Sequence, residues 1–405
     1  MERQAQIDRR RFGWIAGAAA LAAAARTRGE APAGDPAAWR WLDTTQTEPE
    51  GAFRLARRGD RTWLVTPDGA PFFSVGMNHI DPATLRYPEH GDLLGERYGG
   101  DVQRWLRERV GPDLREWGFN SIGNTVEMAS NGATNHKQSR YFTRAEYNAI
   151  GLPYCHQLPF AEFHHWDAQN RKPDFFAPEF ADWCDYVARE YCSSMADDPD
   201  LIGYFYVDCP SWVHTHPHSR WRGPLFDPAR LASDEGRREL FDLATQYYRV
   251  THDAVRRYDP HHLILGDRYE GRGRMAEEVL QAAKPYVDVL SFQNFGEPDQ
   301  IRDDLDEWAG RIGMPVLLAD SGGKHVLEDG SHRHDTEAYR RIMDLTLANP
   351  ECVGFHLCGA YMKNRIRRKG LLYEDETPDQ PVIDAITRVN REAAERVDRM
   401  ASEST

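Results

Sequence analysis

Three aspartates in this chain stand directly after short apolar runs, at Asp208, Asp267 and Asp320. Hydrolysis of a glycosidic bond uses two carboxyl groups, one protonated to release the leaving oxygen and one ionised at the sugar carbon. Asp208 and Asp320 are the only carboxylates directly after the runs 201–207 and 316–319, and the choice of these two runs rests on the resemblance given at the end of this section. We therefore predict Asp208 as the proton donor and Asp320 as the ionised carboxylate of such a pair.

Polar and aromatic residues follow the other apolar runs or lie in the neighbouring loops. Amides, imidazoles and a guanidinium can hydrogen-bond the hydroxyl groups of a sugar, and tryptophan offers a flat face for its ring. The residues predicted to bind a carbohydrate substrate are Asn78, His79, Asn124, His165, Trp212, His214, Asp267, Arg268, Asn294 and His356. This set implies no cofactor. Residues of the same types that only order the loops by hydrogen bonding are the structural alternative.

Three alternatives to this carboxylate pair remain open. His214 and His216 are spaced to present two imidazoles to one metal, which would indicate a metal-dependent hydrolase on the same fold. Cys209 would act as a nucleophile only if a neighbouring cation lowered its pKa, and a Cys beside Pro210 is more often a small buried filler. A carbohydrate-binding barrel that has lost catalysis is the alternative outside the enzymes.

The elements that must position these residues alternate regularly along the chain. Amphipathic segments lie between the apolar runs, as in the helical spacing of Leu240, Leu243, Tyr247 and Val250. Parallel strands need crossover helices, and no glycine-rich phosphate loop follows the first run, so a doubly wound sheet is disfavoured. We predict an α/β fold, a (β/α)8 TIM barrel, whose strand ends carry the site. The eight predicted strands are 72–77, 119–123, 152–158, 201–207, 263–266, 287–292, 316–319 and 353–357.

An amino-terminal hairpin is predicted to lead into the first barrel strand. The apolar segments 62–65 and 71–76 flank a turn at Pro67-Asp68-Gly69. We expect residues 34–405 to form a single barrel domain with this hairpin at its start.

Residues 1–33 are similar to a twin-arginine export signal. Arg9, Arg10 and Arg11 precede Phe12 and an Ala/Gly-rich run over residues 15–25. A basic amphipathic helix is the alternative. Elsewhere no run reaches the roughly 18 apolar residues of a membrane helix, so we expect no stable membrane insertion. The segment predicts an exported protein, periplasmic or extracellular.

The formal net charge of −14 argues against nucleic acid or anionic lipid as a partner. A chain of this charge accommodates a neutral or cationic substrate more easily. The oligomeric state stays open. The six cysteines form no C-x-x-C pair, and we expect six free thiols.

Several segments, in order, resemble agarases and related clan A glycoside hydrolases. They are residues 67–78, 201–210, 314–322, 353–357 and 370–373, and the resemblance spans roughly residues 51–390. It implies a TIM-barrel glycosidase, with galactans as the expected substrates.

The chain departs from that family's pattern at the catalytic positions. Asp208 stands where the family has Asn, Cys209 where it has the acid/base Glu, and Asp320 where it has the nucleophilic Glu. Asp is one methylene shorter than Glu, so on an unchanged backbone the gap between the carboxylates widens. A wider gap admits a water molecule and favours inversion of the anomeric carbon.

Overall fold

The computed structural model describes residues 39–130, 136–164, 166, 173–213, 227–270, 275–328 and 330–403. The predicted export segment and the predicted site residues His165, His214 and His216 lie outside these ranges. Residues Pro36–Thr405 form one compact unit. Among the described helices, none is both long enough and apolar enough to cross a membrane.

Eight parallel strands close into a barrel in chain order, which confirms the predicted (β/α)8 fold. Pairing of Gly354 with Ser74 and of Leu357 with Met77 joins the last strand to the first. The strands are β5 (Ser74–Met77), β6 (Ser121–Ile122), β9 (Tyr154–Gln157), β10 (Leu201–Asp208), β11 (Leu263–Glu270), β12 (Leu290–Asn294), β13 (Val316–Ser321) and β16 (Cys352–Leu357).

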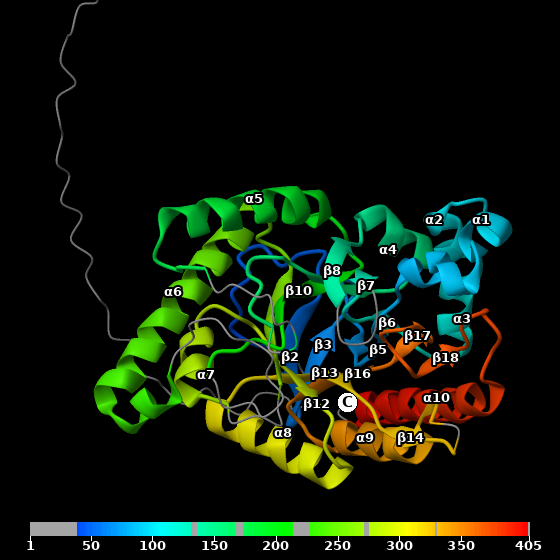
Figure 1. The fold of residues 1–405 in the computed structure, drawn as a ribbon. Coiled ribbons are helices and arrows are strands. Elements are labelled where there is room, and N and C mark those ends of the chain that lie inside the picture. The colour runs from blue at the N-terminus through cyan, green and yellow to red at the C-terminus, as the bar shows by residue number, and fades with distance from the viewer. Residues whose placement is uncertain are drawn as a thin grey trace, which may run out of the picture. The chain divides into compact units, whose positions relative to one another are not determined.

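Helices connect successive strands and cover the outside of the barrel (Figure 1). The later connections contain α5 (Pro178–Met195), η4 (Pro228–Ala232), α6 (Asp234–Tyr258), α7 (Glu277–Ala283), α8 (Pro298–Ile312) and α9 (Thr336–Ala348), and α10 (Gln380–Glu403) follows the last strand. The first two connections contain η1 (Pro82–Arg86), η2 (Pro88–His90), α1 (Leu93–Tyr98), α2 (Val102–Trp105), the π-helical η3 (Leu106–Val110), α3 (Gly111–Glu116) and α4 (Arg144–Ile150).

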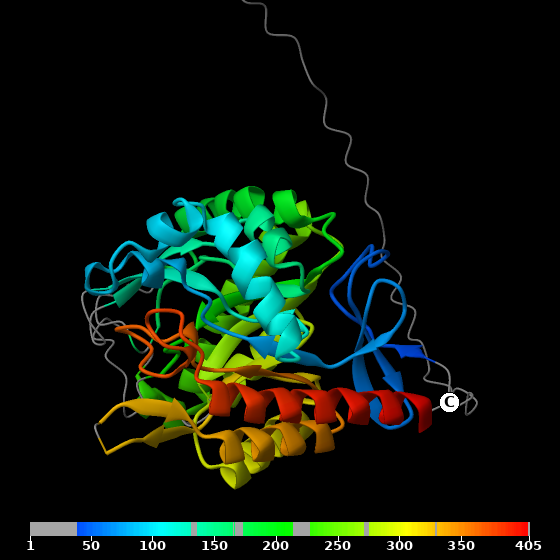
Figure 2. The ribbon, with the colours of Figure 1, turned by 90° about the vertical axis from the view of Figure 1, so that its right-hand side faces the viewer.

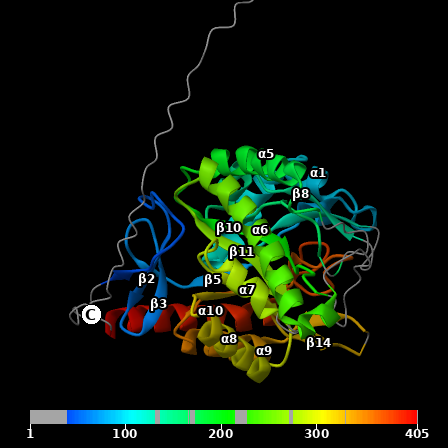
Figure 3. The same cartoon turned by 90° about the vertical axis from the view of Figure 1, so that its left-hand side faces the viewer.

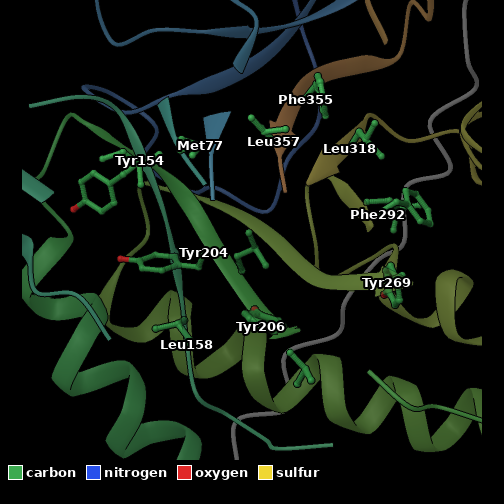
Figure 4. Close-up of a cluster of buried hydrophobic side chains, with 14 of the residues drawn as sticks. Met77, Tyr154, Leu158, Tyr204, Tyr206, Tyr269, Phe292, Leu318, Phe355 and Leu357 are labelled. Atoms are coloured by element: carbon green, nitrogen blue, oxygen red, sulfur yellow. The ribbon is translucent and has the colours of Figure 1, made fainter. Parts of the chain in front are cut away.

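Side chains on the outer face of the strands form the layer between barrel and helices. Successive side chains of a strand point to opposite faces, so alternate positions of β10 and β11 face this layer. Tyr204, Tyr206 and Tyr269 are fully buried there, and Figure 4 shows them among other apolar side chains of the barrel strands.

A four-stranded antiparallel sheet precedes the barrel and contains β1 (Arg40–Trp41), β2 (Arg54–Arg58), β3 (Arg61–Val65) and β4 (Pro71–Phe72). The predicted hairpin is its β3–β4 pair, in which Leu64 lies opposite Phe72. Phe53, Leu55 and Leu64 join one apolar cluster with inward residues of the barrel strands, such as Phe205 and Leu263. The sheet therefore closes the amino end of the barrel, at the right of the view in Figure 2 and the left in Figure 3.

Three small two-stranded sheets follow barrel strands, and the sequence patterns predicted none of them. They pair β7 (Val126–Ser130) with β8 (His136–Tyr141), β14 (Lys324–Val326) with β15 (His332–His334), and β17 (Ala360–Met362) with β18 (Gly370–Leu372). In Figure 2 they lie on the side opposite the amino-terminal sheet, at the carboxyl ends of the strands. This is the end at which barrel enzymes carry their active sites.

Candidate active site

One guanidinium bridges the two aspartates that the sequence selected. Arg268, on β11, is fully buried. Its Nη1 donates to Asp208 Oδ1 at 2.7 Å, and its Nη2 lies 3.2 Å from Asp320 Oδ2. Asp208 ends β10 and Asp320 lies near the end of β13, so the barrel brings three strands together at this cluster. The structure thus places the predicted pair and Arg268 in direct contact.

Residues at the end of β5 hold the other side of Asp320. Asn78 Nδ2 donates to Asp320 Oδ1 at 2.8 Å and to the carbonyl oxygen of Ala319 at 2.9 Å. His79 Nε2 lies 3.3 Å from Asp320 Oδ2. Gly123 leaves room for Asn78, since a Cβ there would lie 2.1 Å from Asn78 Oδ1. Asn78 and His79 therefore belong to the cluster, as predicted from their position after the first strand.

The surroundings favour the ionised form of Asp320. Burial by itself raises the pKa of its carboxyl group, but hydrogen bonding from His79 and the charges of Arg268 and Arg367 outweigh burial and lower it. Burial and the charge of Arg367 lower the pKa of His79, which favours the neutral imidazole. Arg367 Nη2 lies 3.3 Å from His79 Nδ1, an arrangement that leaves the proton on Nε2 to face Asp320. Asp320 thus meets the electrostatic requirement for the ionised partner.

Three donors converge on the carboxylate of Asp208. Besides Arg268, Gln293 Nε2 donates to Oδ1 at 2.6 Å and Trp166 Nε1 donates to Oδ2 at 3.1 Å. Burial raises the pKa of Asp208, but the charge of Arg268 outweighs it, and the net pKa is lowered. A carboxylate held in this way does not retain a proton. The prediction that Asp208 is the proton donor is therefore corrected: its lowered pKa favours the ionised carboxylate.

The backbone takes a left-handed conformation at the ends of two site strands. His79 has φ 57° and Cys209 has φ 49°, although neither is glycine. Each costs on the order of 1–3 kcal/mol and persists because its surroundings fix it. The amide of Cys209 donates to the carbonyl oxygen of Arg268 at 3.0 Å, and that of His79 to Asn124 O at 2.9 Å. Strain at these two positions fits a functional site rather than a plain barrel rim.

The surroundings of Cys209 favour its neutral thiol. Burial, then the charges of Asp208 and Glu270, raise its pKa well above the ordinary value. This contradicts a nucleophilic thiolate and agrees with the buried-filler interpretation. All six cysteines are buried free thiols.

Glu270 is a carboxylate at the site that the sequence patterns did not select. It is buried at the end of β11, two positions after Arg268 and so on the same inward face of the strand. It is near enough to Cys209 to raise the thiol pKa. A carboxyl group from β11 thus lies close to the end of β10. The left-handed Gly266 (φ 63°) marks the irregularity that hid the end of this strand.

Asp267 and Trp212 meet away from the cluster. Asp267 accepts hydrogen bonds from Trp212 Nε1 at 3.2 Å, Tyr247 Oη at 2.9 Å and Tyr248 Oη at 2.7 Å. Tyr247 and Tyr248 belong to α6, so Asp267 points outward from the barrel. The predicted contact of these two residues with substrate is corrected to a structural connection between β11 and α6. Trp166, in the same loop region, contacts Asp208 instead.

Asn294 and His356 also have structural partners. Asn294 donates to Asp304 of α8 at 2.7 Å and accepts from the amide of Gly296 at 3.0 Å. His356 is fully buried inside the barrel, with Nε2 2.8 Å from Ser74 Oγ. Neither residue hydrogen-bonds to Asp208 or Asp320 within the part of the chain that the structure describes, so the geometry does not support their predicted role in binding substrate.

Asn124 remains available for a ligand. Its amide nitrogen donates to Asn78 Oδ1 at 2.7 Å, which places it beside the cluster. Its side-chain oxygen is buried and has no hydrogen-bond partner among the described residues. A buried acceptor without a partner is costly, and a substrate hydroxyl would satisfy it. Asn124 therefore keeps its predicted role as a candidate substrate-binding residue.

His79, Asp320 and Cys358 are close enough together to share a metal ion, with ligand atoms within 4.8 Å of one another. The surrounding charge disfavours a divalent cation: Arg367 and Arg268 act on Asp320, and the half-buried Lys369 lies near Cys358. Burial and the charge of Asp320 raise the pKa of the Cys358 thiol to about 12, whereas a metal requires the thiolate.

No family model matches this chain. It is 23% identical to β-agarase B from Vibrio sp. (strain JT0107) over 492 aligned residues, which cover 87% of this chain and 49% of that protein. The chain thus spans about half the length of this relative. Two solved structures are also similar in fold. An exo-β-agarase superposes with a TM-score of 0.66 at 18% identity, over 88% of this chain and 67% of the other. The agarase AgWH50C superposes with a TM-score of 0.63 at 20% identity, over 87% of this chain and 65% of the other.

Proposed function

We propose that this chain is a glycoside hydrolase that acts on an oligosaccharide or polysaccharide outside the cytoplasm. The observation that carries the proposal is the pair of ionised aspartates, bridged by Arg268, at the carboxyl end of the barrel. The sequence similarity to a β-agarase over 87% of the chain supports the same reaction class and makes galactans the first substrates to test.

Asp320 has the properties of the carboxylate that acts at the anomeric carbon. Asn78 and His79 fix its orientation, and its lowered pKa keeps it ionised at neutral pH. A preorganised negative charge stabilises the positive charge that develops on the sugar ring as the bond to the leaving oxygen breaks. In an inverting reaction the same carboxylate takes a proton from the attacking water.

The leaving oxygen needs a proton from a second group, and we assign this role to Glu270. Asp208 is unsuited because Arg268, Gln293 and Trp166 stabilise its carboxylate. We assign Asp208 to positioning Arg268 and the neighbouring Trp166. Transfer from Glu270 to the glycosidic oxygen, with addition of water at the anomeric carbon, balances the reaction.

We further propose inversion of configuration and export. The shorter Asp320 leaves room for a water molecule, and detection by NMR of a first product with retained configuration would refute inversion. Export depends on residues 1–33. Replacing Arg9, Arg10 and Arg11 by Lys should keep the protein in the cytoplasm, and unchanged export would refute a twin-arginine signal.

The direct test is reducing-sugar release from a panel of galactans and other polysaccharides by the wild type and four variants. Asp320→Asn and Glu270→Gln should each lower kcat/KM at least about 100-fold, since general acid–base groups contribute about 10²–10⁴-fold. Asp303→Asn is the matched control, because it changes the same group on the exposed face of α8. Asp208→Asn should lower kcat/KM less than Asp320→Asn does. Activity that is unaffected by both Asp320→Asn and Glu270→Gln would refute the assignment.

A sugar-binding barrel without catalysis is the second candidate, and one observation favours it. Both strand-end aspartates are already ion-paired to Arg268, and Cys209 replaces the expected acid. This alternative predicts saturable binding of a glycan by calorimetry without product. Release of reducing ends from the same glycan would exclude it.

A further inference from the structure

A strongly basic segment lies at the carboxyl end of the barrel, beside the proposed site. Residues 363–369 join β17 to β18, and five of these seven residues are Lys or Arg, with no acidic residue among them. This contrasts with the chain's formal net charge of −14. Figure 2 shows the segment in orange on the side of the barrel opposite the amino-terminal sheet.

Two residues of this segment reach the strand ends that carry the site. Arg367 Nη2 lies 3.3 Å from His79 Nδ1, directly after β5. Lys369 Nζ donates to the carbonyl oxygens of Gly322 and Gly323, at 3.2 and 3.1 Å, directly after β13. The positive charge is therefore part of the site's wall and not of a remote surface.

Acidic side chains offset this charge only in part: Asp320 lies near enough for the charge of Arg367 to lower its pKa. Among the described residues Lys324, Arg367, Arg368 and Lys369 form no ion pair, whereas Arg365 pairs with Glu89 and Lys363 lies 3.8 Å from Glu374. Lys324, Arg368 and Lys369 also lie near enough to His332 to lower its pKa together, after the effect of burial. We call Lys324, Arg367, Arg368 and Lys369 the basic cluster.

Like charges gathered with no ion pair of their own repel one another, and an anion bound between them would relieve this repulsion. We propose that the site takes an anionic glycan, with a sulfate ester or uronate carboxylate bound by Arg367 and Arg368 while the adjacent sugar lies at Asp320. The proposal rests on the proposed function for its saccharide class. It replaces the expectation of a neutral or cationic substrate, which used the charge of the whole chain and overlooked its local distribution.

Binding to the full-length protein tests this by calorimetry, with three oligosaccharides of equal length. One carries sulfate esters on a galactan, one is an oligogalacturonate, and one is a neutral agaro-oligosaccharide. At low salt we expect one anionic ligand to bind at least about tenfold more tightly than the neutral one, the effect of one charge-assisted hydrogen bond. Which of the two binds more tightly identifies sulfate or carboxylate.

The variant Arg368→Gln, at an exposed residue that contacts neither His79 nor Asp320 among the described residues, should weaken this preference at least about threefold and leave binding of the neutral ligand unchanged. The control Arg399→Gln removes a charge at the far end of α10, beside the amino-terminal sheet, and should keep the preference. Equal binding of all three ligands, a preference that is undiminished in Arg368→Gln, or equally tight binding of DNA would overturn the proposal. Binding of an anionic glycan without turnover would refute only the hydrolase proposal, and turnover of neutral glycans without anionic preference would refute only this inference.

Discussion

Replacing Arg268 by Met leaves two buried carboxylates without their shared counter-ion. The Arg268 side chain is fully buried, and those of Asp208 and Asp320 are only 8% and 4% exposed. Breaking a buried ion pair by removal of one partner costs about 3–5 kcal/mol. Asp208 keeps Gln293 as a donor and Asp320 keeps Asn78, so we expect about 3 kcal/mol of lost unfolding free energy at pH 7.

This loss should shrink as the pH falls. In the wild type both carboxyl groups have lowered pKa values in the folded state, so their contribution is present above the unfolded pKa, about 3.9, and is lost below it. In Arg268→Met burial is less opposed and raises both pKa values, so the folded variant gains protons and relative stability between pH 7 and 4.

Urea unfolding at pH 7 and pH 4.5 measures the difference, with Arg311→Met as control. Arg311 pairs with Glu277 and Glu307 on the exposed surface, where an ion pair contributes little, so its removal should leave the urea midpoint nearly unchanged. A loss below about 1 kcal/mol for Arg268→Met, or one equal at both pH values, would refute the argument from buried charge.

Three further predictions follow from the buried groups and their charges. Burial raises the pKa of Asp81 to about 7, so the folded state favours its protonated form and stability falls as the pH rises from about 4 to 7. Asp81→Asn should therefore raise the free energy of unfolding by about 2–4 kcal/mol at pH 8 and change it little at pH 4. A urea midpoint equal to that of the wild type at pH 8 would contradict this. Asp267→Asn should lower the free energy of unfolding by about 1–3 kcal/mol, because it disturbs the hydrogen bonds from Tyr247 and Tyr248. It should leave KM for the substrate unchanged. A raised KM with normal stability would restore the predicted role of Asp267 in binding. Dialysis against a chelator should leave activity unchanged, since cations surround Asp320, and a loss reversed by added zinc would refute this expectation.

The barrel could be predicted because its signals are local and repeated. Each barrel strand is a short apolar run, and the amphipathic spacing between runs requires crossover helices. The small sheets beyond the barrel, such as β14–β15, were missed. The strands of β14–β15 are three residues long and rich in polar side chains, as in Lys324–Val326, so they carry no apolar alternation.

At the site, position after a strand identified Asp208, Asp320, Arg268, Asn78 and His79 but did not give the direction of each side chain. Asp267 and Arg268 are adjacent and point to opposite faces of β11, and the left-handed Gly266 shifts the register that decides which one faces inward. The protonation states of Asp208 and Asp320 could not be predicted either, because they depend on contacts between strands far apart in sequence.

Chemical rescue of Asp320→Gly tests the central claim most directly, namely that the Asp320 carboxylate acts at the anomeric carbon. The glycine variant removes the carboxylate and leaves space for a small anion. The account predicts loss of at least about 99% of reducing-sugar release, with recovery on addition of formate or azide and no such recovery in Asp303→Gly, which should stay active throughout. Retention of most of the activity by Asp320→Gly without added anion would contradict the account.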